Sequence, residues 1–162
     1  MSLINTPENI GAAPVVSQPL LAAVQKSIGS VPNMFRIIAN SPATRERIAL
    51  AVAQANDCDY CLAAHSYLGQ HMAKLTSHEI AANRRGGSTD AKADAAVRLA
   101  YDITINRGEI DPALMKVVQA AGYSDAEIVE IITHVALNTL TNYINKVLAT
   151  EVDFPAATEL AA

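Results

Sequence analysis

Apolar residues recur at helical spacing along most of this chain, and no convincing stretch alternates with a period of two residues. The longest helical pattern extends from Ser124 to about Thr150, where aliphatic residues return every three or four positions. Helix start and stop signals divide the rest, with Asp90 and Asp111 as expected N-caps and Gly86-Gly87 as an expected stop. These features predict an all-α fold.

The spacing and the caps together predict the bounds of the individual helices. We expect helices over residues 17–28, 33–39, 44–55, 58–74, 76–85, 90–107, 111–121 and 124–150. Two of them begin with the pattern of a capping box, Thr76-x-x-Glu79 and Ser124-x-x-Glu127. No repeat or linker interrupts the pattern, so we expect one domain over residues 1–162, with residues 1–16 and 156–162 irregular.

The composition suits helices that pack closely. Alanine contributes 30 of the 162 residues, Phe and Tyr together only seven, and there is no Trp. Charged residues make up 17% and the net charge is −4, which excludes both a disordered acidic chain and a basic surface for nucleic acid. With no signal sequence and no apolar run of about 18 residues, the expected location is the cytoplasm, away from the membrane. Few charges and many apolar residues also predict a homo-oligomer that covers apolar surface.

The two cysteines of the chain lie three residues apart, at Cys58 and Cys61. On a helix they are neighbours, and His65 follows four residues later on the same stripe. In a reducing compartment such a pair is more typical of redox chemistry than of a structural staple. The first turn of a helix stabilises a thiolate, and this effect alone favours Cys58, the more N-terminal sulfur, as the nucleophile.

A carboxylate on the preceding helix completes the candidate site. If the chain reverses at Asn56-Asp57, the two helices pack antiparallel, and Glu46 can meet His65 across their interface. The carboxylate would then orient the imidazole that accepts the thiol proton.

Less specific interpretations stay open at this point. The cysteine pair could be chance in an Ala-rich helix, Cys58, Cys61 and His65 could bind zinc with Glu46 as a fourth ligand, and Glu46 could be a solvated charge. The remaining histidines, His71, His78 and His134, are interpreted as surface or core residues. Asn138, Asn142 and Asn145 share one face of the last helix with His134, which indicates a helix interface or a position near the site.

The spacing of these residues resembles a known motif. Glu46, eleven intervening residues, Cys58-x-Tyr60-Cys61 and, after three more residues, His65 are similar to the alkylhydroperoxidase AhpD motif of the carboxymuconolactone decarboxylase-like family. Further segments resemble the same family, namely residues 31–35, 45–53, 121–125, 141–145 and 152–155. The best-known members have a histidine between the cysteines, where this chain has Tyr60.

The resemblance implies an all-α, AhpD-like domain with the CxxC motif on a helical hairpin, assembled as trimers or hexamers. It also implies a peroxidase that reduces a small hydroperoxide without a bound cofactor or metal and is recycled by an external dithiol. In that cycle Cys61, not Cys58, attacks the peroxide, Cys58 resolves the product as a disulfide, and His65 with Glu46 relays the proton. The alternatives are a lactone decarboxylase of the same family and a non-catalytic thiol redox sensor.

Overall fold

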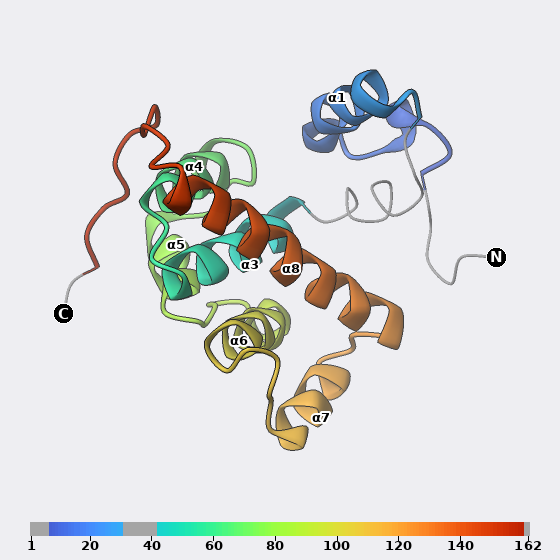
Figure 1. The fold of residues 1–162 in the computed structure, drawn as a ribbon. Helices are drawn as coiled ribbons and strands as arrows, with labels where there is room; N and C mark the ends of the chain where they lie inside the picture. The colour runs from blue at the N-terminus through green and yellow to red at the C-terminus, as the bar shows by residue number, and fades with distance from the viewer. Residues whose placement is uncertain (1–6, 31–41, 161–162) are drawn as a thin grey trace. The chain divides into compact units, whose positions relative to one another are not determined.

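The computed structural model describes residues 7–30 and 42–160, and within these ranges the regular structure is entirely helical (Figure 1). Two 3₁₀-helices, Ile10–Ala12 and Val15–Ser17, precede α1 (Gln18–Ile28). The other helices are α3 (Pro42–Ala55), α4 (Asp59–His71), α5 (Ser77–Arg84), α6 (Ala91–Ile105), α7 (Pro112–Ala120) and α8 (Asp125–Val147). The predicted all-α fold is confirmed.

The helix bounds agree closely with those expected from the caps and the apolar spacing. The largest differences are at two C-termini, because α4 ends at His71 rather than near Lys74 and α8 ends at Val147 rather than near Thr150. The helix expected over residues 33–39 lies outside the described residues. The structure divides into two compact units, Met1–Pro42 and Ala43–Ala162, and the single domain expected from the sequence stays a prediction.

The first unit is held together by a small apolar cluster and by one glutamine. Leu21 of α1 and Ala13 are buried against each other, with Ile10 packed on them. Gln18 Nε2 donates to the carbonyl oxygens of Gly11 and Ala13, which fixes the start of α1 on the preceding turns.

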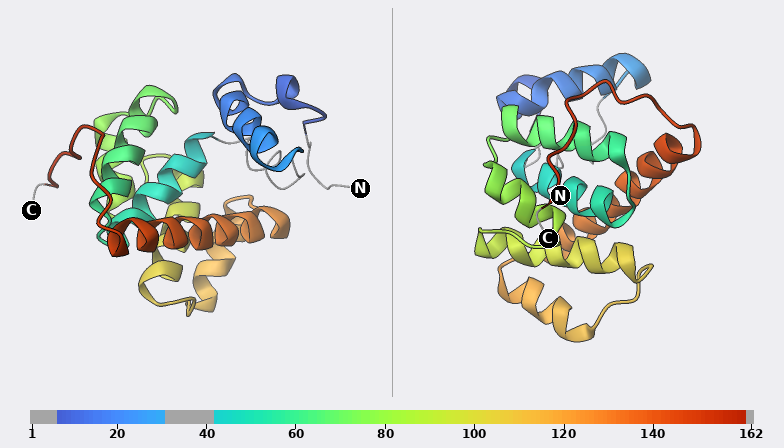
Figure 2. Two further views of the ribbon diagram at one scale, coloured as in Figure 1. Left: turned by 45° about the horizontal axis from the view of Figure 1, so that its top comes forward. Right: turned by 90° about the vertical axis from the view of Figure 1, so that its left-hand side faces the viewer.

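The second unit is built around α6, which packs against α7 and α8 (Figures 1 and 2). Its core draws on α3, α6, α7 and α8 and consists of Ile48, Val52, Ala95, Ala96, Leu99, Ala100, Val118, Ile128, Ile131 and Val135. The alanines of α6 allow the neighbouring helices to approach closely, as the composition predicted.

Helix ends in the second unit use the expected side chains. Asp90 and Asp111 accept backbone hydrogen bonds at the starts of α6 and α7, and Ser124 with Glu127 forms a complete capping box at the start of α8. Gly86 follows α5 with φ of 78°, and a Cβ there would stand 2.7 Å from the ring of Tyr101. Only glycine satisfies both conditions at this turn.

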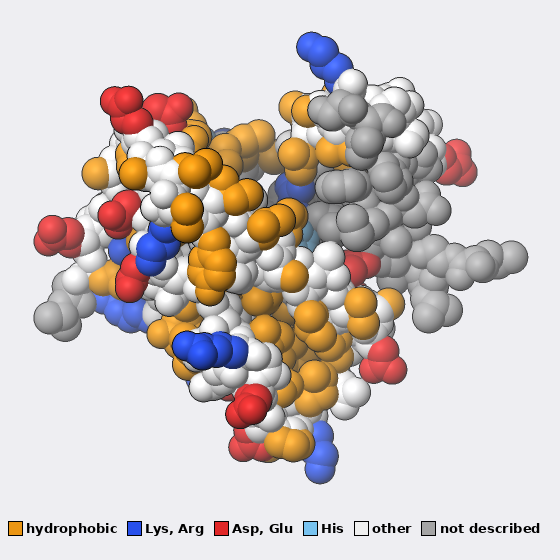
Figure 3. Space-filling view, in the orientation of Figure 1, with side chains coloured by type: hydrophobic (Ala, Val, Ile, Leu, Met, Phe, Trp, Pro, Cys, Tyr) orange, Lys and Arg blue, Asp and Glu red, His pale blue; other side chains and the backbone are white. Residues whose placement is uncertain are grey.

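The long helix α8 has one buried face and one exposed apolar face. Ile128, Ile131 and Val135 belong to the core. Many of its other large apolar side chains are exposed, namely Val129, Ile132, Leu137, Leu140, Tyr143, Ile144 and Val147, and Leu148 follows them. Orange side chains lie along this helix in Figure 3. Within the described ranges, no helix is long and apolar enough to cross a membrane.

Candidate functional site

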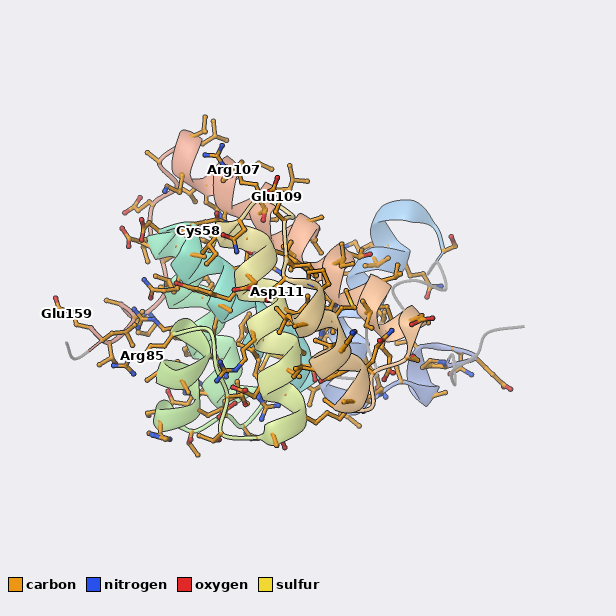
Figure 4. The ribbon with its side chains drawn as sticks, turned by 90° about the horizontal axis from the view of Figure 1, so that it is seen from below. Cys58, Arg85, Arg107, Glu109, Asp111 and Glu159 are labelled. Carbon is orange, nitrogen blue, oxygen red and sulfur yellow. A yellow bond between two sulfur atoms is a disulfide. The ribbon has the colours of Figure 1, made fainter. Side chains whose placement is uncertain are left out.

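The site begins at the corner between α3 and α4. Asp57 takes a left-handed backbone conformation, with φ of 50°, and the chain reverses there. Cys58 is the N-cap of α4, in an extended conformation, and its Sγ accepts a hydrogen bond from the backbone N–H of Cys61 at 3.4 Å. The turn-forming pair Asn56-Asp57 therefore places the first cysteine at the helix N-terminus, as the sequence predicted (Figure 4).

The helices α3 and α4 form an antiparallel hairpin. Next to the corner, Ala53 of α3 is buried in one cluster with Cys61 and Leu62 of α4. Farther from the corner, Glu46 meets His65, and a Cβ at Gly69 would lie 3.9 Å from the Cβ of Glu46. Pairs more distant from the corner join residues farther apart in the sequence, which is the pattern of antiparallel packing.

The two sulfur atoms are joined and buried. Cys58 and Cys61 form a disulfide, with their Cα atoms 5.3 Å apart, a separation in the usual range for such bonds. The exposed fractions of the two residues are 1% and 3%. The two cysteines therefore form a disulfide at the start of a helix, and this disulfide is shielded from solvent.

The carboxylate of Glu46 lies against the imidazole of His65. Glu46 Oε2 and His65 Nδ1 are 2.8 Å apart, and the side chains are 15% and 23% exposed, respectively. With Nδ1–H donating to the carboxylate, the imidazole keeps Nε2 as an acceptor. Glu46 is therefore a partly buried partner of the histidine and not a solvated charge.

A second histidine stands close to this pair. His134 of α8 is buried, and burial lowers its pKa from 6.5 to about 4; the positive charge of Arg45 acts in the same direction, while Glu46 opposes both. His134 is therefore a neutral core residue near neutral pH, in agreement with the sequence interpretation.

Amide side chains join the last turns of α8 to the hairpin. Asn56 Nδ2 at the corner donates to Asn142 Oδ1 at 3.0 Å, and Lys146 Nζ donates to the carbonyl oxygen of Asn56 at 2.6 Å. Asn145 Nδ2 donates to Cys61 Sγ at 3.4 Å. In the described part of the chain the side-chain donor to this sulfur is Asn145, and His65 makes no hydrogen bond to either sulfur.

The C-terminal tail covers the start of α4. The ring of Phe154 meets the ring of Tyr60 edge-on at 5.8 Å and lies 5.9 Å from the ring of Tyr67. Ala157 packs on the buried cluster that contains both cysteines, and Arg84 Nη1 donates to the carbonyl oxygen of Thr158. Tyr60, which lies between the two cysteines, is thus a contact of this tail.

A buried carboxylate fixes the outer end of the hairpin. Glu79 of α5 accepts hydrogen bonds from Arg47 of α3, from Asn83, and from Ser88 and Thr89 in the following loop. Burial alone would raise its pKa, but the hydrogen bonds from Ser88, Thr89 and Asn83 outweigh burial and hold the pKa far below 4.5. The capping box predicted at Thr76 is only half present, because Glu79 is used in this network instead.

The alternative zinc site finds no support in the geometry. Across residues 7–30 and 42–160, no three His, Cys, Asp or Glu side chains are grouped so that they could hold a metal ion. His71 and His78 are exposed, as expected for surface residues.

The sequence predicted Asn145 only as one of three asparagines at a helix interface or near the site, without a contact to a sulfur. In the tail it indicated a family-like segment at residues 152–155, but nothing local indicates which helix a terminal segment will cover.

Part of the chain is similar to a known protein family. Residues 35–105 match the model of the Carboxymuconolactone decarboxylase family. No curated protein gives a significant match.

Several solved structures share the fold at low sequence identity. A peroxidase-related protein from Silicibacter sp. TM1040 is 21% identical with a TM-score of 0.64, over 99% of this chain and 100% of that one. A peroxidase-related protein with an alkylhydroperoxidase AhpD core, from Ralstonia eutropha JMP134, is 20% identical with a TM-score of 0.58, over 89% and 88%. The debrominase Bmp8 is 18% identical with a TM-score of 0.64, over 94% of both chains. Residues 35–105, fewer than half of the chain, are therefore similar to the carboxymuconolactone decarboxylase family, and the solved structures share the all-α fold of this protein.

Proposed function

We propose that this protein is a cysteine-dependent peroxidase that reduces a small hydroperoxide through a Cys58–Cys61 dithiol–disulfide cycle. The observation that supports the proposal most is the closed, buried cysteine pair at the start of α4, with the Glu46–His65 pair one helical turn farther along the same hairpin. No other group of described residues combines thiols, a base and a carboxylate in this way.

The cycle has three balanced steps. The Cys61 thiolate attacks the terminal oxygen of the peroxide, so that an S–O bond forms, the O–O bond breaks and an alkoxide leaves. His65, protonated by the Cys61 thiol and held by Glu46, returns that proton to the alkoxide. The sulfenic acid on Cys61 then condenses with the Cys58 thiol, which releases water and forms the disulfide.

The third step regenerates the thiols. An external dithiol donates two electrons and two protons by thiol–disulfide exchange and is itself oxidised to a disulfide. This demand for a dithiol donor favours a cytoplasmic location, where such donors are kept reduced.

A turnover assay tests the proposal. Wild type, Cys61→Ser and Cys58→Ser are supplied with hydrogen peroxide or an alkyl hydroperoxide and with dithiothreitol as the reductant. We expect wild type to turn over, Cys61→Ser to be inactive, and Cys58→Ser to lose disulfide-based recycling. Full multi-turnover activity in Cys58→Ser would show that its resolving role is wrong.

The same assay includes a second electrophile. Because a debrominase has the same fold, 2,3,4-tribromopyrrole, which is bound in another structure of that enzyme, is offered in parallel. Debromination without peroxide reduction would overturn the peroxidase proposal and assign the cysteines to dehalogenation. A wild type that closes its disulfide with peroxide but never turns over with any reductant would instead be a redox sensor.

We also propose that the protein is a homo-oligomer, a trimer or a hexamer. The exposed apolar face of α8 supports this proposal, since a contiguous apolar helix face of this kind is typical of protein interfaces. Light scattering at micromolar concentration tests it, and a monomer would overturn it.

A further inference from the structure

We propose that Asn145 is a catalytic residue of this site, which stabilises the thiolate of Cys61 by donating a hydrogen bond to its sulfur. The inference deepens the proposed function and rests on it. Asn145 comes from α8, 84 positions away from Cys61 in the sequence. It lies outside the motif from Glu46 to His65, in the segment 141–145.

The position of the donor is fixed from both sides. Three residues before Asn145, Asn142 is fully buried and accepts from Asn56 at the α3–α4 corner. One residue after it, Lys146 donates to the backbone of the same Asn56. These contacts hold this turn of α8 against the corner, so that the amide of Asn145 reaches the sulfur at 3.4 Å.

The two sulfur atoms have different donors. Cys58 Sγ accepts from a backbone N–H of its own helix, whereas Cys61 Sγ accepts from the side chain of Asn145. A hydrogen bond to an ionised acceptor is stronger than one to a neutral acceptor. The amide therefore favours the reduced, ionised Cys61 over its thiol and over the disulfide.

This arrangement explains how Cys61 can be the nucleophile although Cys58 occupies the helix N-terminus. The helix dipole favours a thiolate at Cys58, and Asn145 supplies a competing stabilisation at Cys61. An amide does not titrate, so the stabilisation is present at every pH, while His65 accepts the proton.

The same donor selects the sulfur that an external reductant attacks. In thiol–disulfide exchange the better leaving group is the sulfur whose thiolate is more stable. A thiolate of the reductant then forms a new S–S bond with Cys58 as the Cys58–Cys61 bond breaks, and Cys61 leaves as the thiolate held by Asn145. A second thiolate of the donor breaks the mixed disulfide, so that Cys58 leaves as a thiolate and is protonated from solvent.

The test measures the thiols themselves and needs no peroxidase activity. In a Cys58→Ser background, iodoacetamide alkylation of Cys61 is followed from pH 5 to 9 with Asn145 intact, with Asn145→Leu, which removes the donor, and with Asn145→Asp, which presents only acceptors. Thr141→Val is the matched control, because it removes a hydrogen-bonding side chain from the same helix whose acceptors are the α8 carbonyl oxygens of Leu137 and Asn138 and not a sulfur. Circular dichroism verifies that each variant is folded.

We expect Asn145→Leu to slow alkylation of Cys61 about tenfold at pH 7, the effect of losing a hydrogen bond to a charged group, and to move the midpoint of the pH profile upward. Asn145→Asp should slow it further, and Thr141→Val should change it less than twofold. In a Cys61→Ser background, alkylation of Cys58 should be unaffected by Asn145→Leu. Alkylation of Cys61 that is unchanged in both Asn145 variants, or slowed equally by Thr141→Val, would overturn the inference.

A second measurement uses the intact cysteine pair. Asn145→Leu should make the disulfide about tenfold harder to reduce at equilibrium with dithiothreitol, which corresponds to about 30 mV. An unchanged potential would contradict the proposed role. If these shifts are found in a protein that does not consume peroxide, the peroxidase proposal fails while the role of Asn145 stands.

Discussion

His65 has one hydrogen-bond partner in the hairpin, the carboxylate of Glu46 across the interface, and it lies one turn after Cys61 on its own helix. The imidazole is therefore oriented by the carboxylate while the cysteines are still joined as a disulfide.

We expect Glu46→Gln and His65→Gln each to slow oxidation of Cys61 by peroxide about 10²-fold or more, since a positioned base is typically worth about 10²–10⁴-fold. The double variant should be little slower than the worse single variant, because the two residues act as one unit. Stopped-flow measurement of thiol loss provides the rates, and Glu109→Gln, an exposed residue labelled in Figure 4, is the control. If Cys61 of Glu46→Gln is oxidised by peroxide at the wild-type rate from pH 6 to 9, Glu46 and His65 do not act as a proton relay.

His134 links the stability of the fold to pH. Its pKa is lowered from 6.5 to about 4, first by burial and then by Arg45, so the unfolded chain takes up the proton before the folded protein does. Stability is therefore full above pH 6.5 and is lost as the pH falls toward 4. At about 1.4 kcal/mol for each pH unit, the loss amounts to about 3 kcal/mol.

Urea unfolding at pH 7, 5.5 and 4.5 measures this loss. We expect His134→Gln to flatten the fall in the free energy of unfolding between pH 7 and pH 4.5, whereas His78→Gln, at an exposed position, should leave the fall unchanged. If the free energy of unfolding of His134→Gln falls between pH 7 and pH 4.5 as steeply as that of wild type, groups other than His134 cause the fall.

At the scale of helices, the capping-box pattern of Ser or Thr followed three residues later by Glu leads to two different structures. Glu127 completes the capping box of α8 by accepting from the backbone N–H and the hydroxyl of Ser124. Glu79, in the same position of the same pattern, is buried and joins α3, α5 and the loop before α6. The sequence alone cannot distinguish the two, because the difference depends on Arg47, which is 32 positions away from Glu79.

The two glutamates should therefore differ in their effect on stability. We expect Glu79→Ala to destabilise the fold by about 3–5 kcal/mol, because Arg47 loses its partner in a buried network, and Glu127→Ala by about 1 kcal/mol, as for the loss of a cap. Chemical denaturation at pH 7 compares them. Because the pKa of Glu79 is lowered, its contribution is present above pH 4.5 and is lost as the pH falls below that value. Equal losses in the two variants would contradict the network.

The C-terminal tail is the second element with a testable role. Phe154 and Ala157 cover the start of α4, where both sulfurs are almost fully buried. In thiol–disulfide exchange, the thiolate of a reductant must approach one sulfur along the axis of the S–S bond. The tail therefore limits the access of a reductant to the disulfide.

We expect a chain that ends at Thr150 to be reduced by dithiothreitol several-fold faster than the full chain, because access to the sulfur increases. Phe154→Ala should give an intermediate rate, and removal of residues 161–162 alone should have no effect. Equal rates in the full chain and in the shortened one would show that the tail does not restrict access.

At the scale of the whole molecule, local signals predicted more of the fold than of the site. The helices, their caps and the hairpin follow from residues close together in the sequence, such as Asn56-Asp57 at the corner and Ser124-x-x-Glu127 at the start of α8. The contacts of Asn145 with Cys61 and of Arg84 with Thr158 join residues 84 and 74 positions apart. Such contacts depend on tertiary packing, which spacing along one helix does not reveal.

The exposed face of α8 was also only partly predictable. Helical spacing identified one apolar stripe, interpreted as core or subunit interface, but Val147 at 81% exposure belongs to neither the core nor any covered surface of this chain. This surface is the basis for the proposed homo-oligomer, because its apolar side chains are exposed in the described part of the chain (Figure 3).

The central claim is that Cys58 and Cys61 form one two-electron couple that a peroxide oxidises. The most direct measurement is a titration of thiols in the reduced protein before and after one equivalent of hydroperoxide, with peptide mapping of the product. We predict that two thiols per chain disappear for each peroxide consumed, and that the product is the Cys58–Cys61 disulfide. Two thiols per chain that remain after the peroxide is added would contradict the account.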